Sequence, residues 1–104
     1  MGLKEKALEA IASDIRRRIL HLLESGDRSF TEIQTTVELN KGSLNYHMKG
    51  LLRSGLVTNI YERRAASSPR LYSYYKLTSF GAYALDWYKT FKGPSTEPKL
   101  VEAQ

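Results

Sequence analysis

Residues 40–57 read NKGSLNYHMKGLLRSGLV and carry the signals of a helix with one buried face. Asn40 is a favourable N-cap, and Gly55 stands where a helix commonly ends in the left-handed conformation. Between them the apolar residues recur at helical spacing; they are Leu44, Met48, Leu51 and Leu52. We therefore predict a helix from Asn40 to about Ser54 with a polar outer face.

A shorter helix is predicted directly before it. Thr31 is placed to cap this helix, and Ile33 and Val37 would face inward. Residues 29–31 are expected to be a brief extended link, and residues 38–40 a short turn. Two short helices joined by a tight turn form the helix-turn-helix arrangement.

Two further helices are predicted upstream. The first is short and amphipathic, with a narrow apolar stripe made of Leu3, Ala7 and Ile11. The second begins after Ser13 or Asp14 and stops at residues 25–27, which read SGD. Its inward positions are Ile15, Ile19, Leu22 and Leu23.

Beyond Gly55 the pattern changes from helical to strand spacing. Residues 56–63 and 70–77 are rich in β-branched or aromatic side chains, which favours two strands. The stretch between them, 64–69, reads RAASSP and has the composition of a flexible connection. These segments predict a β-hairpin with a long basic tip.

Thr78 is placed to cap a last helix with a wide aromatic stripe. That stripe contains Phe80, Ala84, Trp87 and Phe91, with Leu85 and Tyr88 beside them. Residues 93–104 show no periodicity, and a disordered tail is expected there.

The predicted fold is mainly α with a β-hairpin (α+β), in the order α-α-α-α-β-β-α, which is a winged helix-turn-helix. The chain has 104 residues, enough for one domain with a cooperative core, expected over residues 1–92.

Positive charge is concentrated in one part of the chain. The sequence has 16 Lys+Arg and 11 Asp+Glu, a formal net charge of +5. Between Lys41 and Lys76 seven basic residues face a single acidic one, Glu62, so this segment carries +6 and the remainder −1. A segregated field of this kind suits a polyanion, with nucleic acid as the leading candidate and a solvated basic face as the alternative.

Several other classes of protein are disfavoured. The chain has no cysteine, so disulfides, thiolate metal sites and cysteine nucleophiles are excluded. The charged N-terminal stretch lacks the features of a signal peptide, and no apolar run is long enough to cross a bilayer. We expect a cytoplasmic protein, associated with the nucleoid when bound to DNA, that is not an enzyme and needs no cofactor or metal. His47 is expected to be structural and partly buried, and His21 is isolated.

Three motifs resemble the arsenical-resistance-repressor-like (ArsR-like) regulators. Residues 40–57 resemble their recognition helix, residues 13–20 (SDIRRRIL) resemble their Asp-x-x-Arg-x-x-Ile-Leu helix, and residues 77–81 (LTSFG) resemble the opening of the last helix in several winged-helix families. The resemblance implies a homodimeric transcription regulator, a repressor rather than an activator. Metal-sensing members carry cysteines in the helix before the recognition helix; residues 32–37 here read EIQTTV, so that sensor is absent.

The candidate DNA-binding residues lie on the predicted recognition helix and at the hairpin tip. Asn45 can bond an adenine edge, Ser43 a base or phosphate and Tyr46 a thymine methyl or phosphate, while basic side chains neutralise phosphates. The arginines at the tip would follow the backbone or enter the minor groove, with Arg64 the leading candidate. The full set is Lys41, Ser43, Asn45, Tyr46, Lys49, Arg53, Arg63, Arg64 and Arg70. The remaining arginines, Arg16, Arg17, Arg18 and Arg28, are expected either to touch phosphates or to pair with Glu24, Glu32 or Asp14.

The first and last helices offer more apolar surface than a small tri-helical core can use. We expect a homodimer interface there, formed by Leu3, Ala7, Ile11, Phe80, Ala84, Trp87, Tyr88 and Phe91. An aromatic effector pocket is a weaker interpretation, and in a third the last helix simply covers its own domain.

Two other functions remain compatible with these patterns. A winged helix also serves as a protein-interaction module of transcription or chromatin assemblies. A non-specific architectural DNA binder would share the salt dependence of a regulator but prefer no sequence.

Overall fold

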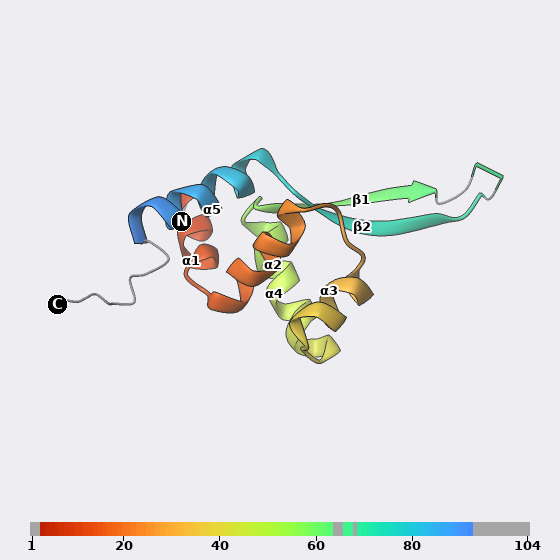
Figure 1. Ribbon diagram of the computed structural model, residues 1–104, viewed down its shortest axis with the longest axis horizontal. Helices are drawn as coiled ribbons and strands as arrows, with labels where there is room; N and C mark the ends of the chain where they lie inside the picture. The colour runs from red at the N-terminus through yellow and green to blue at the C-terminus, as the bar shows by residue number, and fades with distance from the viewer. Residues whose placement is uncertain (1–2, 64–65, 68, 93–104) are drawn as a thin grey trace.

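The computed structural model describes residues 3–63, 66, 67 and 69–92, with side chains described from residue 6 to residue 90 of this set. The predicted element order is confirmed. The elements are α1 (Leu3–Ile11), α2 (Asp14–Glu24), α3 (Phe30–Val37), α4 (Lys41–Arg53), β1 (Val57–Arg63), β2 (Leu71–Leu77) and α5 (Ser79–Lys92). The helices gather into one body, and the hairpin projects away from it (Figure 1). The expected disordered tail lies outside the described residues.

Capping side chains explain where the helices begin. The side chain of Ser13 accepts a hydrogen bond from the Arg16 amide (3.3 Å), and that of Asn40 accepts one from the Ser43 amide (2.8 Å), as predicted. The predicted cap of α3, Thr31, is wrong. Ser29 caps α3 instead: its hydroxyl accepts from the Glu32 amide at 3.1 Å.

A capping box explains this correction. The Glu32 carboxylate accepts a hydrogen bond from the Ser29 amide at 2.8 Å, so two backbone N–H groups are satisfied reciprocally. The carboxylate also stands at the positive end of the helix dipole. Thr31 and Gln34 have the same spacing in the sequence, but Gln34 brings no charge, and the helix starts at Phe30.

Helix α2 is the centre of the core. It contacts α1, α3, α4, α5 and β2, so it is covered on more than one side. The sequence pattern places Leu22 in its buried stripe, whereas the structure buries Leu20 completely and leaves Leu22 half-buried. Wide coverage of α2 is the reason, because a helix packed on several sides buries more than one stripe. The fully buried side chains that surround it include Ile33, Leu44, Met48, Leu51 and Leu56.

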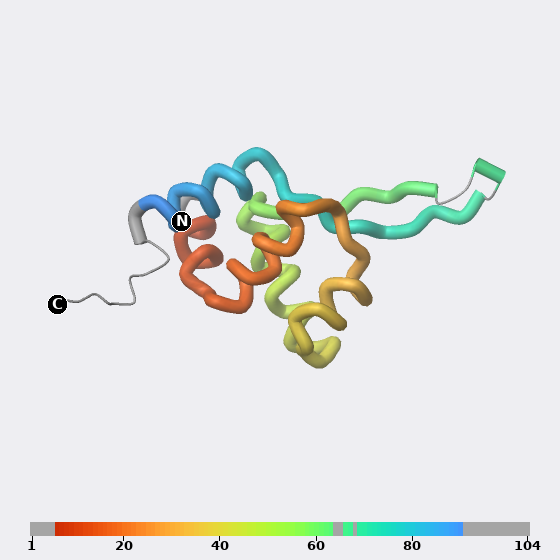
Figure 2. The backbone as a smooth tube through the Cα atoms, viewed as in Figure 1, coloured from red at the N-terminus to blue at the C-terminus, as the bar shows by residue number. Residues whose placement is uncertain are grey.

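The hairpin is held to the helical body at its base. Strands β1 and β2 are antiparallel, in a register that runs from Val57 opposite Leu77 to Arg63 opposite Leu71. Arg28, in the connection between α2 and α3, pairs with Tyr75 of β2 through two backbone hydrogen bonds of 3.1 and 2.8 Å. The extended link predicted at residues 29–31 is wrong for residues 30 and 31, which belong to α3. The tube in Figure 2 shows the connection between α2 and α3 running beside the base of the hairpin before the chain enters α3.

Thr78 caps α5 as predicted, since its hydroxyl accepts from the Gly81 amide at 2.9 Å. The same hydroxyl reaches the carbonyl oxygen of Gly55 at 2.7 Å, which ties α5 to the end of α4. Gly55 itself has a φ of 79°, the left-handed conformation that its predicted place at the end of α4 requires.

The face of α5 that packs on the core is formed by Gly81, Ala84, Leu85 and Tyr88. Phe80 and Trp87 stay half-buried at the side, next to α1. None of the described helices meets the length and apolarity that a membrane span requires.

Candidate nucleic-acid interface

Helix α4 presents a polar and basic arc to solvent. Asn45, Tyr46, Lys49 and Arg53 are all exposed, and successive helical residues turn by about 100°, so these four share one side. Tyr46 is 68% exposed, which is unusual for a tyrosine on a packed helix. The opposite side of α4 carries the buried Leu44, so the sequence separates a packed face from an open one.

Lys41 and Ser43 flank this arc at the start of α4. Lys41 is exposed and lines a shallow hollow with Phe30, Gly42 and Asn45. Ser43 is half-buried, and its backbone amide is already used by the Asn40 cap. Helical spacing turns the side chain of Ser43 away from Asn45 and Lys49, toward the flank of the arc.

Arg16 of α2 contacts α4 from that flank. Its Nε donates a hydrogen bond to Nδ1 of His47 at 3.1 Å, and its guanidinium carbon lies 5.5 Å from the centre of the Tyr46 ring. A Cβ at Gly50 would stand 2.6 Å from the same guanidinium carbon, so the missing side chain makes the room that Arg16 occupies. This positioning role of Arg16 was not assigned from the sequence. The one signal for it in the sequence was the glycine inside α4, Gly50.

His47 is half-buried, as predicted from its place beside the apolar stripe. Burial lowers the pKa of His47 below the ordinary value of 6.5, and the positive charge of Arg16 lowers this pKa further. The neutral ring can accept the hydrogen bond from Arg16, whereas a protonated ring cannot.

A pH dependence of stability follows from this shift. Between the ordinary histidine pKa and the lowered one, the unfolded chain binds the proton more strongly than the folded chain, so stability falls as pH drops through that window. We expect His47→Gln to lose less stability than the wild type between pH 7.5 and pH 5.5 in urea unfolding. Equal losses in both proteins would contradict the assignment.

The outer part of the hairpin carries the basic residues of the wing. Arg63 at the end of β1 and Arg70 just before β2 are both exposed. The guanidinium carbon of Arg70 lies 5.2 Å from the centre of the Tyr72 ring, which holds this side chain along the strand. Arg64, the leading candidate from the sequence, lies outside the described residues.

The basic segment is largely uncompensated at the surface. Lys76, near the base of the hairpin, approaches Asp27 at 3.9 Å. No ion pair is found among the described residues for Lys41, Lys49, Arg53 or Arg63. The positive charge is therefore available along α4 and the outer strands.

The arginines left open by the sequence have different surroundings. Arg17 pairs with Asp14 at 3.3 Å and lies 4.1 Å from the centre of the Tyr88 ring. Arg28 donates to the Ser25 hydroxyl at 3.0 Å rather than to a carboxylate. Arg18 is exposed.

A groove of about 350 Å³ lies between α1 and α5, and we call it the α1–α5 groove. Of the predicted dimer residues, Ala7, Ile11, Phe80, Ala84 and Trp87 line it. Leu8 and Tyr83, which sequence reasoning missed, complete it and are 45% and 69% exposed. Tyr88 points elsewhere, beneath Arg17. The side chains of Leu3 and Phe91 lie outside the described part of the chain.

Within the described residues, no group of three or more His, Asp or Glu side chains is arranged to hold a metal ion. The candidate site is the charged surface formed by the exposed basic residues of α4 and the hairpin.

The comparisons with known proteins agree with this geometry. Residues 11–60 match the family model described as a helix-turn-helix domain. A search of the curated proteins found no match.

Three solved structures illustrate the structural similarity. The homodimeric winged helix-turn-helix DNA-binding domain of a possible ArsR-family transcriptional regulator from Mycobacterium bovis is 23% identical, with a TM-score of 0.68, over 86% of this chain and 77% of that one. The reduced form of the transcriptional regulator YodB from B. subtilis is 20% identical, with a TM-score of 0.69, over 91% and 93%. A PadR family transcription regulator from Clostridium difficile is 26% identical, with a TM-score of 0.66, over 77% and 88%.

The match runs from the end of α1 into β1, and the similarity to the Mycobacterium bovis structure covers 86% of the chain. The expected resemblance is therefore confirmed: residues 11–60 match a helix-turn-helix domain, and the chain shares the winged helix-turn-helix fold of solved structures that include ArsR-family regulators.

Proposed function

We propose that this protein is a sequence-specific double-stranded DNA-binding transcriptional regulator that acts as a homodimeric repressor. The observation that carries the proposal is the exposed basic and polar character of both the outer arc of α4 and the outer part of the hairpin, with its arginines. The function is binding rather than catalysis. The similar structures support it, since those compared above are of transcription regulators, one of them a homodimeric DNA-binding domain.

In this proposal α4 lies in the major groove, which admits a helix and distinguishes the four base pairs. Asn45 would read an adenine edge, and Tyr46 would contact a thymine methyl group or a phosphate. Lys41, Lys49 and Arg53 would neutralise phosphates. The wing would lie along the adjacent backbone or minor groove, where a narrow groove attracts guanidinium groups.

The dimer would form through the α1–α5 groove. Its exposed aromatic and apolar side chains are the type enriched at the centres of protein interfaces. A two-fold arrangement would place the two recognition helices about one turn of DNA apart, roughly 34 Å, and would require a pseudo-palindromic site.

The salt dependence of DNA binding tests the wing. Arg63→Ala should weaken binding to every duplex alike and lower the slope of log affinity against log salt by about one unit, because one phosphate contact is lost. Fluorescence anisotropy at several salt concentrations measures this slope. Lys6→Ala, an exposed cation on α1, is the matched control and should leave the slope unchanged. A slope unaffected by Arg63→Ala would remove this residue from the interface.

The dimer surface has its own test. Tyr83→Glu should give a folded monomer at micromolar concentration, because the side chain is 69% exposed in the protomer and a charge would be buried in the dimer. Sedimentation velocity reports the mass. Ala82→Glu alters a neighbouring exposed position of α5 outside the groove and should remain dimeric. A wild-type monomer, or a dimeric Tyr83→Glu variant, would contradict this interface.

A further inference from the structure

A second groove, of about 400 Å³, lies where α2, α3 and α5 meet. We call it the α2–α5 groove; it shares no residue with the α1–α5 groove or with the proposed DNA surface. Its volume falls within the range of roughly 300–1,000 Å³ in which proteins bind small molecules.

The floor of this groove is apolar. Leu22 of α2, Val37 of α3 and Leu85 of α5 meet there, and the ring of Tyr88 lies beside them. Val37 and Leu85 belong to the buried core, so the floor is fixed by packing. An occupant would need an apolar ring or chain to use this surface.

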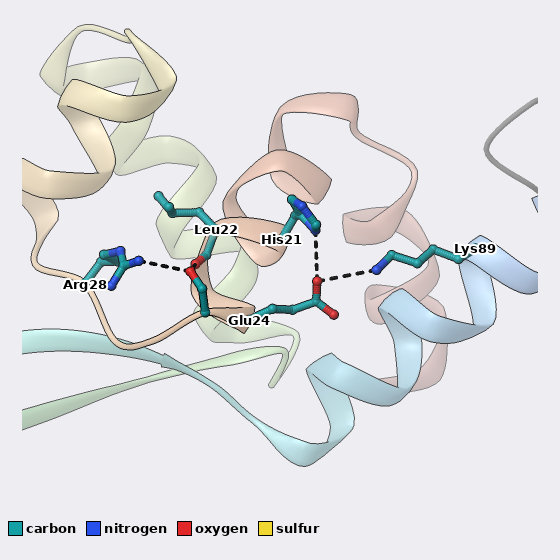
Figure 3. A network of polar contacts seen from close by, with 6 residues as sticks. His21, Leu22, Glu24, Arg28 and Lys89 are labelled. Atoms are coloured by element: carbon teal, nitrogen blue, oxygen red, sulfur yellow. Dashed lines mark hydrogen bonds and ion pairs between the residues drawn. The ribbon is translucent and has the colours of Figure 1, made fainter.

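The rim of the groove is cationic. Arg17, Arg18 and Lys89 line it together with His21, and none of the described residues that line it is acidic, although Glu24 lies at its edge. Lys89 and His21 both contact one oxygen of Glu24, at 3.4 and 2.9 Å, which joins α5 to α2 at the edge of the groove (Figure 3).

Arg18 differs from the other cations of the rim. The guanidinium of Arg17 is occupied by the Ile11 carbonyl oxygen at 2.8 Å and by Asp14. Arg18 is exposed and has no hydrogen bond or ion pair with any residue that the structure describes. Its guanidinium can therefore bind an anionic group above the apolar floor in a bidentate fashion.

We propose that the α2–α5 groove binds an amphiphilic carboxylate, with the apolar part on Leu22 and Leu85 and the carboxylate at Arg18. Three cations at the rim, with no acidic side chain among the described lining residues, disfavour cationic ligands, and the apolar floor disfavours small inorganic anions. The occupant would touch α3, which precedes the recognition helix, and α5, which carries the proposed dimer surface. Binding in this groove does not depend on the proposed DNA function.

Titration of the full chain with 2-naphthoate tests the site without DNA. We expect saturable amide shifts at Leu22, Val37 and Leu85 in ¹H–¹⁵N spectra. The affinity of the uncharged 2-naphthamide should be lower by a factor of about ten or more, because it lacks the charge that Arg18 recognises.

Two variants separate the charge from the cavity. Arg18→Glu should weaken 2-naphthoate binding about tenfold or more by calorimetry, whereas Lys6→Glu, an equal charge reversal outside the groove, should not. Thr36→Trp changes an exposed residue of the lining and should block the groove while leaving the spectrum of the folded core intact. Equal binding of naphthoate and naphthamide, an unaffected Arg18→Glu, shifts confined to the α1–α5 groove, or no binding at all would each overturn the proposal.

Discussion

Gly81→Ala should lower the free energy of unfolding by about 3 kcal/mol. A Cβ at Gly81 would overlap the backbone carbonyl oxygen of Leu56 and would lie 2.8 Å from Cδ1 of Leu77. The obstacle is backbone, which cannot rotate away as a side chain can, so α5 would have to move off the start of the hairpin. This close approach explains the glycine of the LTSFG motif at residues 77–81.

Gly42→Ala is the matched control for this prediction. The new Cβ would meet only Asn40 Oδ1, at an ordinary 3.5 Å, and Gly42 is exposed in the first turn of α4. Alanine is the better helix former, so this variant should be unchanged or more stable by up to about 1 kcal/mol. Urea unfolding compares the two. A Gly81→Ala protein as stable as the wild type would show that α5 does not depend on this contact.

Asn45→Ala and Lys49→Ala should weaken DNA binding in different ways. Loss of a bidentate base contact costs about 1–3 kcal/mol of discrimination, so Asn45→Ala should bind its preferred site roughly 5- to 150-fold more weakly. Binding to unrelated duplexes should change little. Lys49→Ala should weaken binding to all duplexes and lower the salt slope by about one unit, because its contact is with phosphate.

Both residues lie exposed on α4 outside the core, so neither change should affect folding. Competition titrations with preferred and unrelated duplexes provide the comparison. If Asn45→Ala reduced affinity equally for every duplex, the base-reading role assigned to Asn45 would be wrong. An unaltered preferred-site affinity would remove Asn45 from the interface altogether.

Local signals in the sequence were sufficient for most of the fold. Asn40 and Thr78 cap helices by accepting hydrogen bonds from amides three residues further on, and Gly55 ends a helix in the left-handed conformation. Each residue has the predicted role. The start of α3 was mispredicted because two capping patterns overlap, at Ser29 with Glu32 and at Thr31 with Gln34. Only the relative energies of the two caps, which include the charge of Glu32, decide between them.

Features that depend on contacts distant in sequence could not be predicted. The backbone pairing of Arg28 with Tyr75 and the hydrogen bond from Arg16 to His47 join residues far apart in the chain. The exposure of Tyr83 likewise follows from how α5 rotates onto the core. The outer face of α4 was predictable because its residues lie on the side of the helix away from the buried stripe, and that stripe can be recognised within the sequence of this one helix.

Selection of duplexes from a random pool at near-physiological salt, with the stoichiometry measured on the selected duplexes, tests the central claim most directly. A sequence-specific dimer predicts enrichment of a pseudo-palindrome, with half-sites about one DNA turn apart and two chains per duplex. Salt-sensitive binding without enrichment would indicate an architectural DNA binder, and no binding would indicate a protein-interaction module. Either of these two results would contradict the regulator proposed here.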